Sequence, residues 1–219
     1  MFTGIIQAIG HIDRMEPRGG DLRLTIDSGS LGLDESGLGD SIAVNGVCLT
    51  AVNYDGRRFS ADVSRETLDK TSLGGLEPGS PVNLEKALTL ATPLGGHLVS
   101  GHVDGLATLL EMRNDGRSVR YRFEAPAELA RYIAAKGSVT LDGTSLTVNG
   151  VEGRRFDVNI VPHTRDNTLF KTYQIGTRVN LEVDIIARYL ERLLTADADA
   201  SADDGHLLQT LARSGFLKT

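Results

Sequence analysis

The sequence has little of several residue types, and each shortage excludes a class of protein. Its 219 residues include one cysteine, Cys48, and no tryptophan. A single cysteine cannot form a disulfide within the chain, so nothing indicates an oxidising compartment. No run of Lys or Arg is present, and 29 acidic against 23 basic residues give a net charge of −6. The electrostatic signature of a nucleic-acid-binding protein is therefore missing.

Long hydrophobic runs are missing as well. The apolar stretches fall short of the ~18–20 residues that a membrane-crossing helix needs. Residues 1–30 lack the basic and apolar regions of a secretion signal. We therefore expect a cytoplasmic protein, with neither nucleic acid nor membrane as a partner. At this length the chain can form one large domain or two domains of about 100 residues.

An internal repeat decides between one domain and two. The second half aligns on the first without a gap when it is shifted by 97 residues. This shift places SIAVNGVCLT at 41–50 on SVTLDGTSLT at 138–147, GRRF at 56–59 on GRRF at 153–156, and VNLE at 82–85 on VNLE at 179–182. A repeat of this size indicates one structural unit present twice. We predict a first domain over residues 1–96 and a second copy over 97–187.

Turn-forming pairs indicate β structure in both copies. Asn45-Gly46 and Asp142-Gly143 lie between apolar residues, the preferred sequence of a two-residue hairpin turn. Short strand-like segments between such turns are typical of small closed barrels. One helix is expected in each copy, most clearly over residues 126–136, with Pro at its start and Gly after its end. The predicted fold class is all-β, two tandem barrels followed by a C-terminal α-helix.

That C-terminal helix is predicted over residues 184–194. Its apolar residues recur at helical spacing: Ile185, Ile186, Tyr189, Leu190 and Leu193. Such a short helix does not persist alone, so its apolar face needs a partner, and we expect contacts between subunits. Residues 195–219 form an acidic linker and tail. Residues 206–217 resume a weak apolar spacing, for which we have no function.

The positions where the two copies differ are the best candidates for chemistry. Cys48 aligns with Ser145, Ile5 with His102, Asp62 with Asn159, Glu66 with His163, and Ala87 with Asp184. Maintaining a common fold does not require such exchanges.

Each candidate also has an ordinary structural interpretation. His102 can transfer protons near neutral pH or be a hydrogen-bonded structural histidine. A lone cysteine such as Cys48 is usually a small core residue. Ser145 and Thr147 can be strand hydroxyls, and Asp184 can be the N-cap of the terminal helix.

Other kinds of site find no support in the sequence. His97 and His102 are five residues apart, but one cysteine and no second cluster leave zinc without a signature. The glycines at 95–101 match neither the dinucleotide-binding nor the Walker pattern, and no nucleophile-elbow motif is present. No metal site is expected.

Four segments in order resemble the riboflavin synthase family: MFTGII at 1–6, NGVCLT at 45–50, GGHLVSGHV at 95–103 and DGTSLTV at 142–148. The resemblance covers roughly residues 1–190. It implies two six-stranded antiparallel barrels of Greek-key type, a homotrimer in contact through the C-terminal helix, and active sites between the first barrel of one subunit and the second barrel of another. Association with lumazine synthase is a further expectation that the resemblance raises.

The reaction implied by the resemblance is the last step of riboflavin biosynthesis. Two molecules of 6,7-dimethyl-8-ribityllumazine dismutate to riboflavin and 5-amino-6-(D-ribitylamino)uracil by transfer of a four-carbon unit. One lumazine loses a proton from its 7-methyl group, and the other accepts a nucleophile at C7. The heterocycle is the electron sink, so no cofactor is expected and the protein supplies orientation and proton transfer.

The resemblance also implies the site residues. The catalytic candidates are His102, Ser145 and Thr147, together in the second barrel, Cys48 and Ser41 in the first, and Asp184. The substrate-binding candidates are Gly4, Ile5, Ile6, Cys48, Leu49, Thr50, Asp62, Val63, Ser64, Arg65, Glu66, Thr67, Gly101, His102, Val103, Lys136, Ser145, Leu146, Thr147, Asn159, Ile160, Val161, Pro162, His163 and Thr164. Val47 and His163 depart from the family pattern, and His163 has no assigned role.

Two other functions fit part of the pattern. A lumazine or flavin carrier of the same fold would bind its ligand without turning it over, but Cys48, His102 and Ser145 are all present here. An unrelated tandem-barrel interaction module would account for the repeat and the strands. It would have no lumazine pocket.

Overall fold

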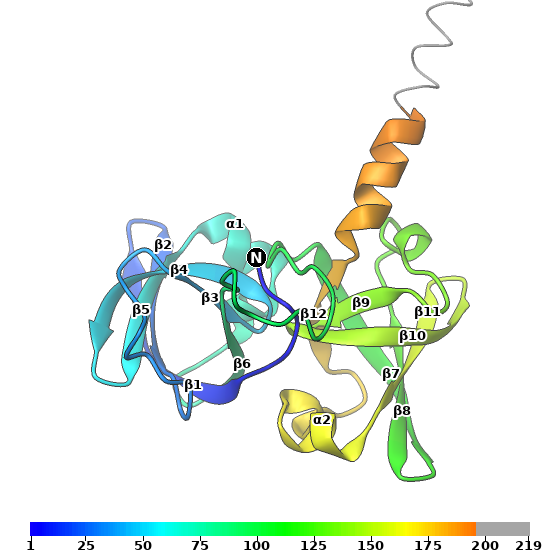
Figure 1. Cartoon of the computed structure of the whole chain (residues 1–219), viewed down its shortest axis with the longest axis horizontal. Coiled ribbons are helices and arrows are strands. Elements are labelled where there is room, and N and C mark those ends of the chain that lie inside the picture. The colour runs from blue at the N-terminus through cyan, green and yellow to red at the C-terminus, as the bar shows by residue number, and fades with distance from the viewer. Residues whose placement is uncertain (196–219) are drawn as a thin grey trace, which may run out of the picture. The chain divides into compact units, whose positions relative to one another are not determined.

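The computed structural model describes residues 1–195, and the strands in this part of the chain form two closed barrels (Figure 1). The first contains β1 (Ala8–Arg18), β2 (Asp21–Asp27), β3 (Ser41–Val44), β4 (Val47–Asp55), β5 (Arg58–Val63) and β6 (Pro81–Lys86). The second contains β7 (Gly105–Asp115), β8 (Ser118–Glu124), β9 (Ser138–Leu141), β10 (Thr144–Glu152), β11 (Arg155–Ile160) and β12 (Arg178–Val183). The predicted fold class is confirmed.

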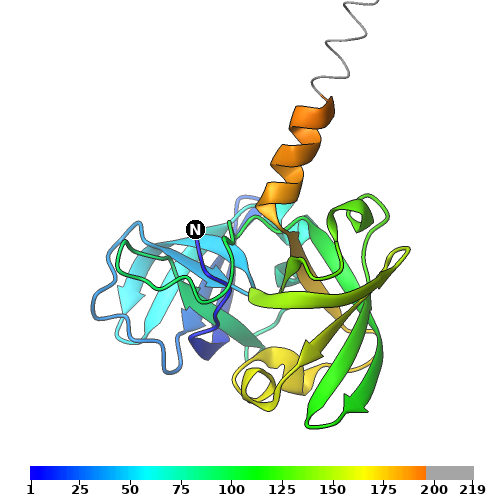
Figure 2. The same ribbon diagram turned by 45° about the vertical axis from the view of Figure 1, so that its right-hand side comes forward.

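The two barrels have the same strand order, and all their pairs are antiparallel. The first closes as β1-β2-β5-β4-β3-β6, and the second as the equivalent β7-β8-β11-β10-β9-β12. Figure 2 shows both barrels from a second direction. In each barrel three strands joined by hairpins are followed by a fourth that returns beside the first of them, as β6 does beside β3. This is the Greek-key arrangement.

Both predicted hairpin turns are confirmed. Asn45 and Gly46 have φ of 48° and 78°, and Asp142 and Gly143 have φ of 42° and 80°. Positive φ at both central residues is the type I′ geometry, whose twist matches that of the flanking strands. The turns connect β3 to β4 and β9 to β10.

Each barrel encloses its own core, because successive strand residues point alternately inward and outward. Ile26, Phe59 and Leu84 are buried in the first barrel. Phe123 and Phe156 are buried in the second, with ring centroids 5.8 Å apart. The barrels are joined through the hairpin turns: Asn83 Nδ2 donates to Asp142 O at 2.9 Å, and the equivalent Asn180 Nδ2 donates to Asn45 O at 2.8 Å.

Short helices follow β5 and β11, at equivalent places in the two copies. They are α1 (Arg65–Lys70) and α2 (Pro162–Asp166), each followed by a 3-10 turn, η1 (Ser72–Gly75) or η3 (Leu169–Thr172). Ser64 is the N-cap of α1, and its hydroxyl accepts a hydrogen bond from Thr67 N at 3.2 Å.

The helix predicted over residues 126–136 is wrong. This segment contains only a 3-10 turn, η2 (Ala130–Tyr132). Leu129 and Ile133 are buried in the core of the second barrel. The chain then turns back into β9 at Lys136, whose φ is 69° and whose amide donates to Val148 O. The apolar spacing therefore reflects a segment that packs on the barrel core, not an α-helix.

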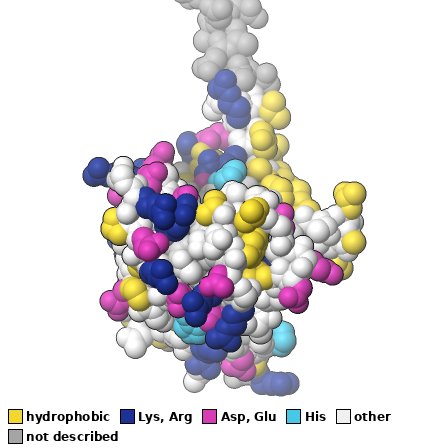
Figure 3. Space-filling model, turned by 90° about the vertical axis from the view of Figure 1, so that its left-hand side faces the viewer, with side chains coloured by type: hydrophobic (Ala, Val, Ile, Leu, Met, Phe, Trp, Pro, Cys, Tyr) yellow, Lys and Arg dark blue, Asp and Glu magenta, His cyan; other side chains and the backbone are white. Residues whose placement is uncertain are grey.

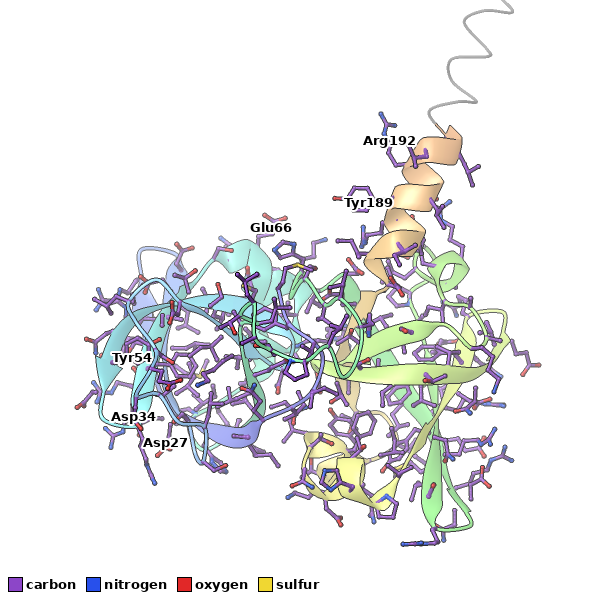
Figure 4. All side chains as sticks on the ribbon, in the orientation of Figure 1. Asp27, Asp34, Tyr54, Glu66, Tyr189 and Arg192 are labelled. Carbon is purple, nitrogen blue, oxygen red and sulfur yellow. The ribbon has the colours of Figure 1, made fainter. Side chains whose placement is uncertain are left out.

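Residues 185–195 form a helix, which is described by itself. Its start lies one residue after the predicted one. Its exposed apolar side chains are Ile186, Tyr189, Leu190, Leu193 and Leu194, and Tyr189 projects outward from the helix in Figure 4. The acidic linker and tail lie, from residue 196 on, outside the described residues. Within residues 1–195 the helices are too short or too polar to cross a membrane.

Candidate active site

Two segments cross from one copy to the barrel of the other. Residues 1–7 lead into β1, yet Gly4 O accepts a hydrogen bond from Ser145 N of the second barrel at 2.8 Å. Residues 98–104 lead into β7, yet Gly101 O accepts from Cys48 N of the first barrel at 2.9 Å. These crossing segments pair with each other through Phe2 and Val99, and Figure 1 shows the N-terminus between the barrels. We call these two contact regions half-sites. The first half-site joins the Cys48 strand of the first barrel to residues 98–104, and the second joins the Ser145 strand of the second barrel to residues 1–7.

Gly4 and Gly101 are required where the crossing segments touch the barrels. Their φ values are 77° and 81°, in the region that favours glycine. A Cβ atom on Gly4 would lie 2.5 Å from Ser145 Cβ, and one on Gly101 would lie 2.6 Å from Cys48 Cβ. A larger residue at either position would have to move the crossing segment away from the half-site.

A buried glutamate holds each crossing segment. Glu85 on β6 accepts hydrogen bonds from Thr3 N and Thr3 Oγ1, both at 2.7 Å, and from Gly4 N at 3.0 Å. Glu182 on β12 accepts from Ser100 N at 2.6 Å, Ser100 Oγ at 2.7 Å and Gly101 N at 3.0 Å. Burial raises the pKa of both carboxyls, and these hydrogen bonds partly oppose the increase.

The sequence prediction missed both glutamates. The signal for them was the VNLE sequence, which the two copies share unchanged at 82–85 and 179–182. A glutamate that both copies keep on an otherwise buried strand indicates a buried carboxylate that accepts hydrogen bonds from nearby groups.

The first half-site is a cavity of about 250 Å³ between α1 and the crossing segment of the second copy. It is lined by Val47, Cys48, Glu66, Thr67, Lys70, Thr71, Gly101, His102 and Val103. Cys48 is half-buried and His102 is exposed. Glu66, labelled in Figure 4, lies on α1 at the upper edge of the barrel. The sequence grouped His102 with Ser145, whereas within one chain the structure groups it with Cys48.

The second half-site contains a histidine that the sequence prediction did not include. His97 Nδ1 lies 2.7 Å from Ser145 Oγ, and His97 Nε2 lies 3.3 Å from Thr140 Oγ1. Burial lowers the pKa of His97, and the negative charge of Asp184 partly opposes this decrease. His97 lies in the 95–103 segment of the resemblance and was rejected as a zinc ligand, but it was not among the predicted site residues; under the 97-residue shift it has no equivalent in the first copy.

A cavity of about 380 Å³ lies beside α2, near the other crossing segment. It is lined by Ile6, Gln7, Ala8, Ile9, Ser30, His163, Asp166, Asn167 and Lys171. Of the predicted residues it contains Ile6 and His163. His163 Nδ1 lies 3.4 Å from Asn167 Nδ2.

Asp62 and Asn159, which are equivalent in the repeat, have different partners. Arg23 forms two hydrogen bonds of 2.6 Å with the Asp62 carboxylate, which holds the pKa of Asp62 below its usual value. The side of the molecule that Figure 3 shows carries basic and acidic side chains next to one another. Asn159 Oδ1, in contrast, is buried and has no hydrogen-bond partner among the described residues.

The remaining predicted residues are more scattered. Ser41 lines a separate cavity of about 210 Å³ with Lys86 and Thr89. The side chains of Leu49, Val63 and Ile160 are buried in the barrel cores. Thr50, Thr147 and Lys136 are exposed, and Asp184 directly precedes the 185–195 helix. Ile5, Arg65, Val161 and Pro162 are exposed, while Leu146 and Thr164 are half-buried.

The side chains of the described region do not suggest a metal site. Within residues 1–195 no three His, Cys, Asp or Glu side chains come together so that they could hold an ion.

Comparisons with known proteins identify the repeated unit. The model of the lumazine binding domain matches this chain twice, over residues 3–87 and 100–184. Riboflavin synthase of Photobacterium phosphoreum is 44% identical over 217 residues, which is 99% of this chain and 100% of that protein. Riboflavin synthase of Mycobacterium bovis is 47% identical over 89% of this chain and 98% of its own length. That of Bacillus subtilis is 42% identical over 99% and 100%.

Solved structures show the same fold. A crystal structure of LumP in complex with riboflavin is similar with a TM-score of 0.77 at 24% identity, over 84% of this chain and 100% of that one. A structure of LumP in complex with 6,7-dimethyl-8-(1'-D-ribityl) lumazine has a TM-score of 0.75, over 84% and 99%.

Proposed function

Because this chain belongs to the riboflavin synthase family, we propose that it converts two molecules of 6,7-dimethyl-8-ribityllumazine into riboflavin and 5-amino-6-(D-ribitylamino)uracil. The observation that carries this proposal is the pair of half-sites. Their backbone contacts are equivalent, since the hydrogen bond from Ser145 N to Gly4 O repeats the one from Cys48 N to Gly101 O. They differ in the side chains that can react. Two similar sites with different chemistry suit a reaction in which one compound has two roles.

The two half-sites divide the substrate contacts. In the first we place one lumazine against Cys48, Leu49, Thr50, the 62–67 segment and residues 101–103. In the second we place the other lumazine against residues 4–6, Ser145, Leu146, Thr147 and the 159–164 segment. Lys136 stays a prediction for the second half-site. The unpartnered Asn159 Oδ1 supports this placement, because a buried acceptor costs about 1–3 kcal/mol unless a donor reaches it.

The first half-site fits the lumazine that loses its proton. His102 lies in the cavity with Cys48 and is open to solvent, so its imidazole can exchange a proton with the 7-methyl group and then with water. The second half-site then holds the lumazine that accepts a nucleophile at C7. Thr147, Ser41 and Asp184 stay predictions as catalytic residues.

Two features support a homotrimer with shared sites. The first cavity, about 250 Å³, is smaller than the ~300–1,000 Å³ usual for enclosed ligand sites, so a second surface is needed to cover the substrate. The apolar side chains of the 185–195 helix are exposed, and a helix of this length is not stable without a partner. We propose that the helices join the subunits and that a neighbouring barrel completes each half-site. A cytoplasmic location and association with lumazine synthase stay predictions.

The proposed function is tested with the purified protein and 6,7-dimethyl-8-ribityllumazine as the sole substrate, in the presence of a chelator. Absorbance and chromatography should show one riboflavin for every two lumazines consumed, with one pyrimidine for each riboflavin. Tight binding of lumazine without turnover would overturn the proposal in favour of a carrier of the same fold.

A further inference from the structure

The hydrogen bond between His97 and Ser145 is built into the fold. His97 N donates to Thr3 O at 3.1 Å, and Ser145 N donates to the next carbonyl, Gly4 O, at 2.8 Å. Consecutive peptide groups of one crossing segment therefore set the separation of the two residues. Glu85 accepts hydrogen bonds from the amides of the same two residues, Thr3 N at 2.7 Å and Gly4 N at 3.0 Å. Such rigid support is what a reacting pair of side chains requires.

The surroundings of His97 favour its neutral form. The ring is half-buried, and this burial lowers the pKa of His97, while the negative charge of Asp184 partly opposes the decrease. Thr140 Oγ1, itself buried, lies beside Nε2. With the hydrogen atom on Nε2 donated to Thr140, Nδ1 has a free lone pair directed at Ser145 Oγ, 2.7 Å away. This is the arrangement of a base next to a hydroxyl nucleophile.

We propose that His97 is the catalytic base that activates Ser145 as the nucleophile adding to C7 of the lumazine in the second half-site. This inference rests on the proposed function. In the step, the Ser145 Oγ–H bond breaks and its proton moves to His97 Nδ1. A bond forms between Oγ and C7, and the π electron pair at C7 moves into the pyrimidinedione ring. When the adduct later breaks down, the C7–O bond breaks and His97 returns the proton to Oγ.

The other half-site lacks this pair. Within residues 1–195 no histidine nitrogen forms a hydrogen bond with the Cys48 thiol, although Cys48 is the equivalent of Ser145. His102 lines the same cavity as Cys48, but the imidazole is exposed and its backbone amide is bonded to Ser100 Oγ. A serine needs a base to become nucleophilic, whereas a thiol ionises partly by itself near neutral pH. The second half-site contains the base that a serine nucleophile requires, and this geometry favours Ser145 for the addition at C7.

The test uses His97→Asn, because the asparagine amide oxygen can replace Nδ1 as an acceptor but cannot take the proton. If His97 only orients Ser145, this variant keeps its turnover. If His97 is the base, kcat falls by about 10²- to 10³-fold while the dissociation constant for lumazine changes less than threefold. His11→Gln, at an exposed histidine on β1, is the control and should behave as wild type.

The pH profile and a second variant complete the test. In the wild type, kcat should fall as the pH decreases through the pKa of His97, which lies below the ordinary value of 6.5. His97→Asn should lose this acidic limb. The double variant His97→Asn/Ser145→Cys should have a kcat at least tenfold higher than that of His97→Asn alone, since a thiol depends less on the base. Circular dichroism identifies a variant that does not fold, and His97→Gln, which keeps a partner for Thr140, then replaces it.

The outcomes separate the inference from the proposed function. Wild-type protein that binds lumazine without turnover would overturn both. Active wild-type protein together with an active His97→Asn variant, or with an unchanged acidic limb, would overturn the role of His97 alone.

Discussion

The hydroxyl of Tyr173 donates a hydrogen bond of 2.5 Å to Asp142 Oδ2 in the contact between the two barrels. The other carboxylate oxygen, Oδ1, accepts from Asn180 N at 2.7 Å. Asp142 is fully buried, and this burial raises its pKa from 3.8 to about 7, although both hydrogen bonds act in the opposite direction. In the first copy the same position is Asn45, whose amide oxygen accepts from Asn83 N at 2.8 Å.

Stability should therefore depend on pH through Asp142. Its pKa is higher in the folded state than in the unfolded state, so the folded protein binds the proton more tightly. The resulting stabilisation is complete below about pH 4 and is lost as the pH rises to about 7. Across this range the contribution to the free energy of unfolding should fall by roughly 4 kcal/mol. Urea unfolding of the wild type and of Asp142→Asn at pH 5 and pH 8 measures this contribution. The free energy of unfolding of the variant, relative to that of the wild type, should be higher at pH 8 than at pH 5.

Tyr173→Phe is the matched control for this prediction. It leaves Asp142 buried but removes a donor, so it should lower the free energy of unfolding by about 1–3 kcal/mol at pH 8. An equal pH dependence in wild type and Asp142→Asn would show that Asp142 does not titrate in this range.

The barrels were predictable because their signals are local and occur twice. The Asn45-Gly46 and Asp142-Gly143 turns require φ values that few other residue pairs accept, and the repeat placed both at equivalent positions. The helix over 126–136 was predicted wrongly because Leu129 and Ile133 have a spacing that also suits a segment packed on a barrel core. Five- and six-residue helices such as α2 and α1 are too short to show a periodic pattern.

The candidate site was predictable only in part, because its contacts are not local. His97 and Ser145 are 48 residues apart, and Thr3 and Glu85 are 82 apart. Nothing in the sequence indicates that residues 1–7 cross to the second barrel rather than lying on the first. The repeat therefore identified Cys48 and Ser145 as an unequal pair, but it could not reveal which histidine lies beside each.

Replacing the two glutamates that hold the crossing segments should affect different half-sites. Glu85→Gln replaces a carboxylate that accepts three hydrogen bonds near Gly4, so lumazine binding at the Ser145 half-site should weaken by about tenfold, corresponding to ~1.4 kcal/mol. Glu182→Gln should weaken binding at the Cys48 half-site by a similar factor. Titration of lumazine by fluorescence should resolve a strong and a weakened site in each variant. Equal weakening of both sites by either variant would contradict this division.

Alanine at Gly4 or Gly101 should cost more than strain alone. Each substitution combines an unfavourable positive φ with a Cβ contact under 3.0 Å. Gly153→Ala is the control, since Gly153 has φ of 59° and a methyl group added there would have no heavy atom within 4 Å. Gly153→Ala should destabilise the protein by about 1 kcal/mol. In urea unfolding, Gly4→Ala and Gly101→Ala should lower the free energy of unfolding by at least about 1 kcal/mol more than Gly153→Ala does, and both should reduce turnover.

The exposed face of the 185–195 helix should control assembly. Leu190 and Leu193 are exposed in the single chain, and if three helices meet in the trimer, a charge at Leu190 has to be buried among apolar side chains. Leu190→Glu should therefore convert a trimer into monomers in sedimentation equilibrium and abolish turnover, while each barrel still unfolds as in the wild type. The control is Arg192→Gln, at an exposed residue of the same helix that is labelled in Figure 4. It changes the net charge by the same amount, and this variant should remain trimeric. A monomeric but fully active wild type would instead mean that one chain brings both lumazines together, and the shared site would have to be abandoned.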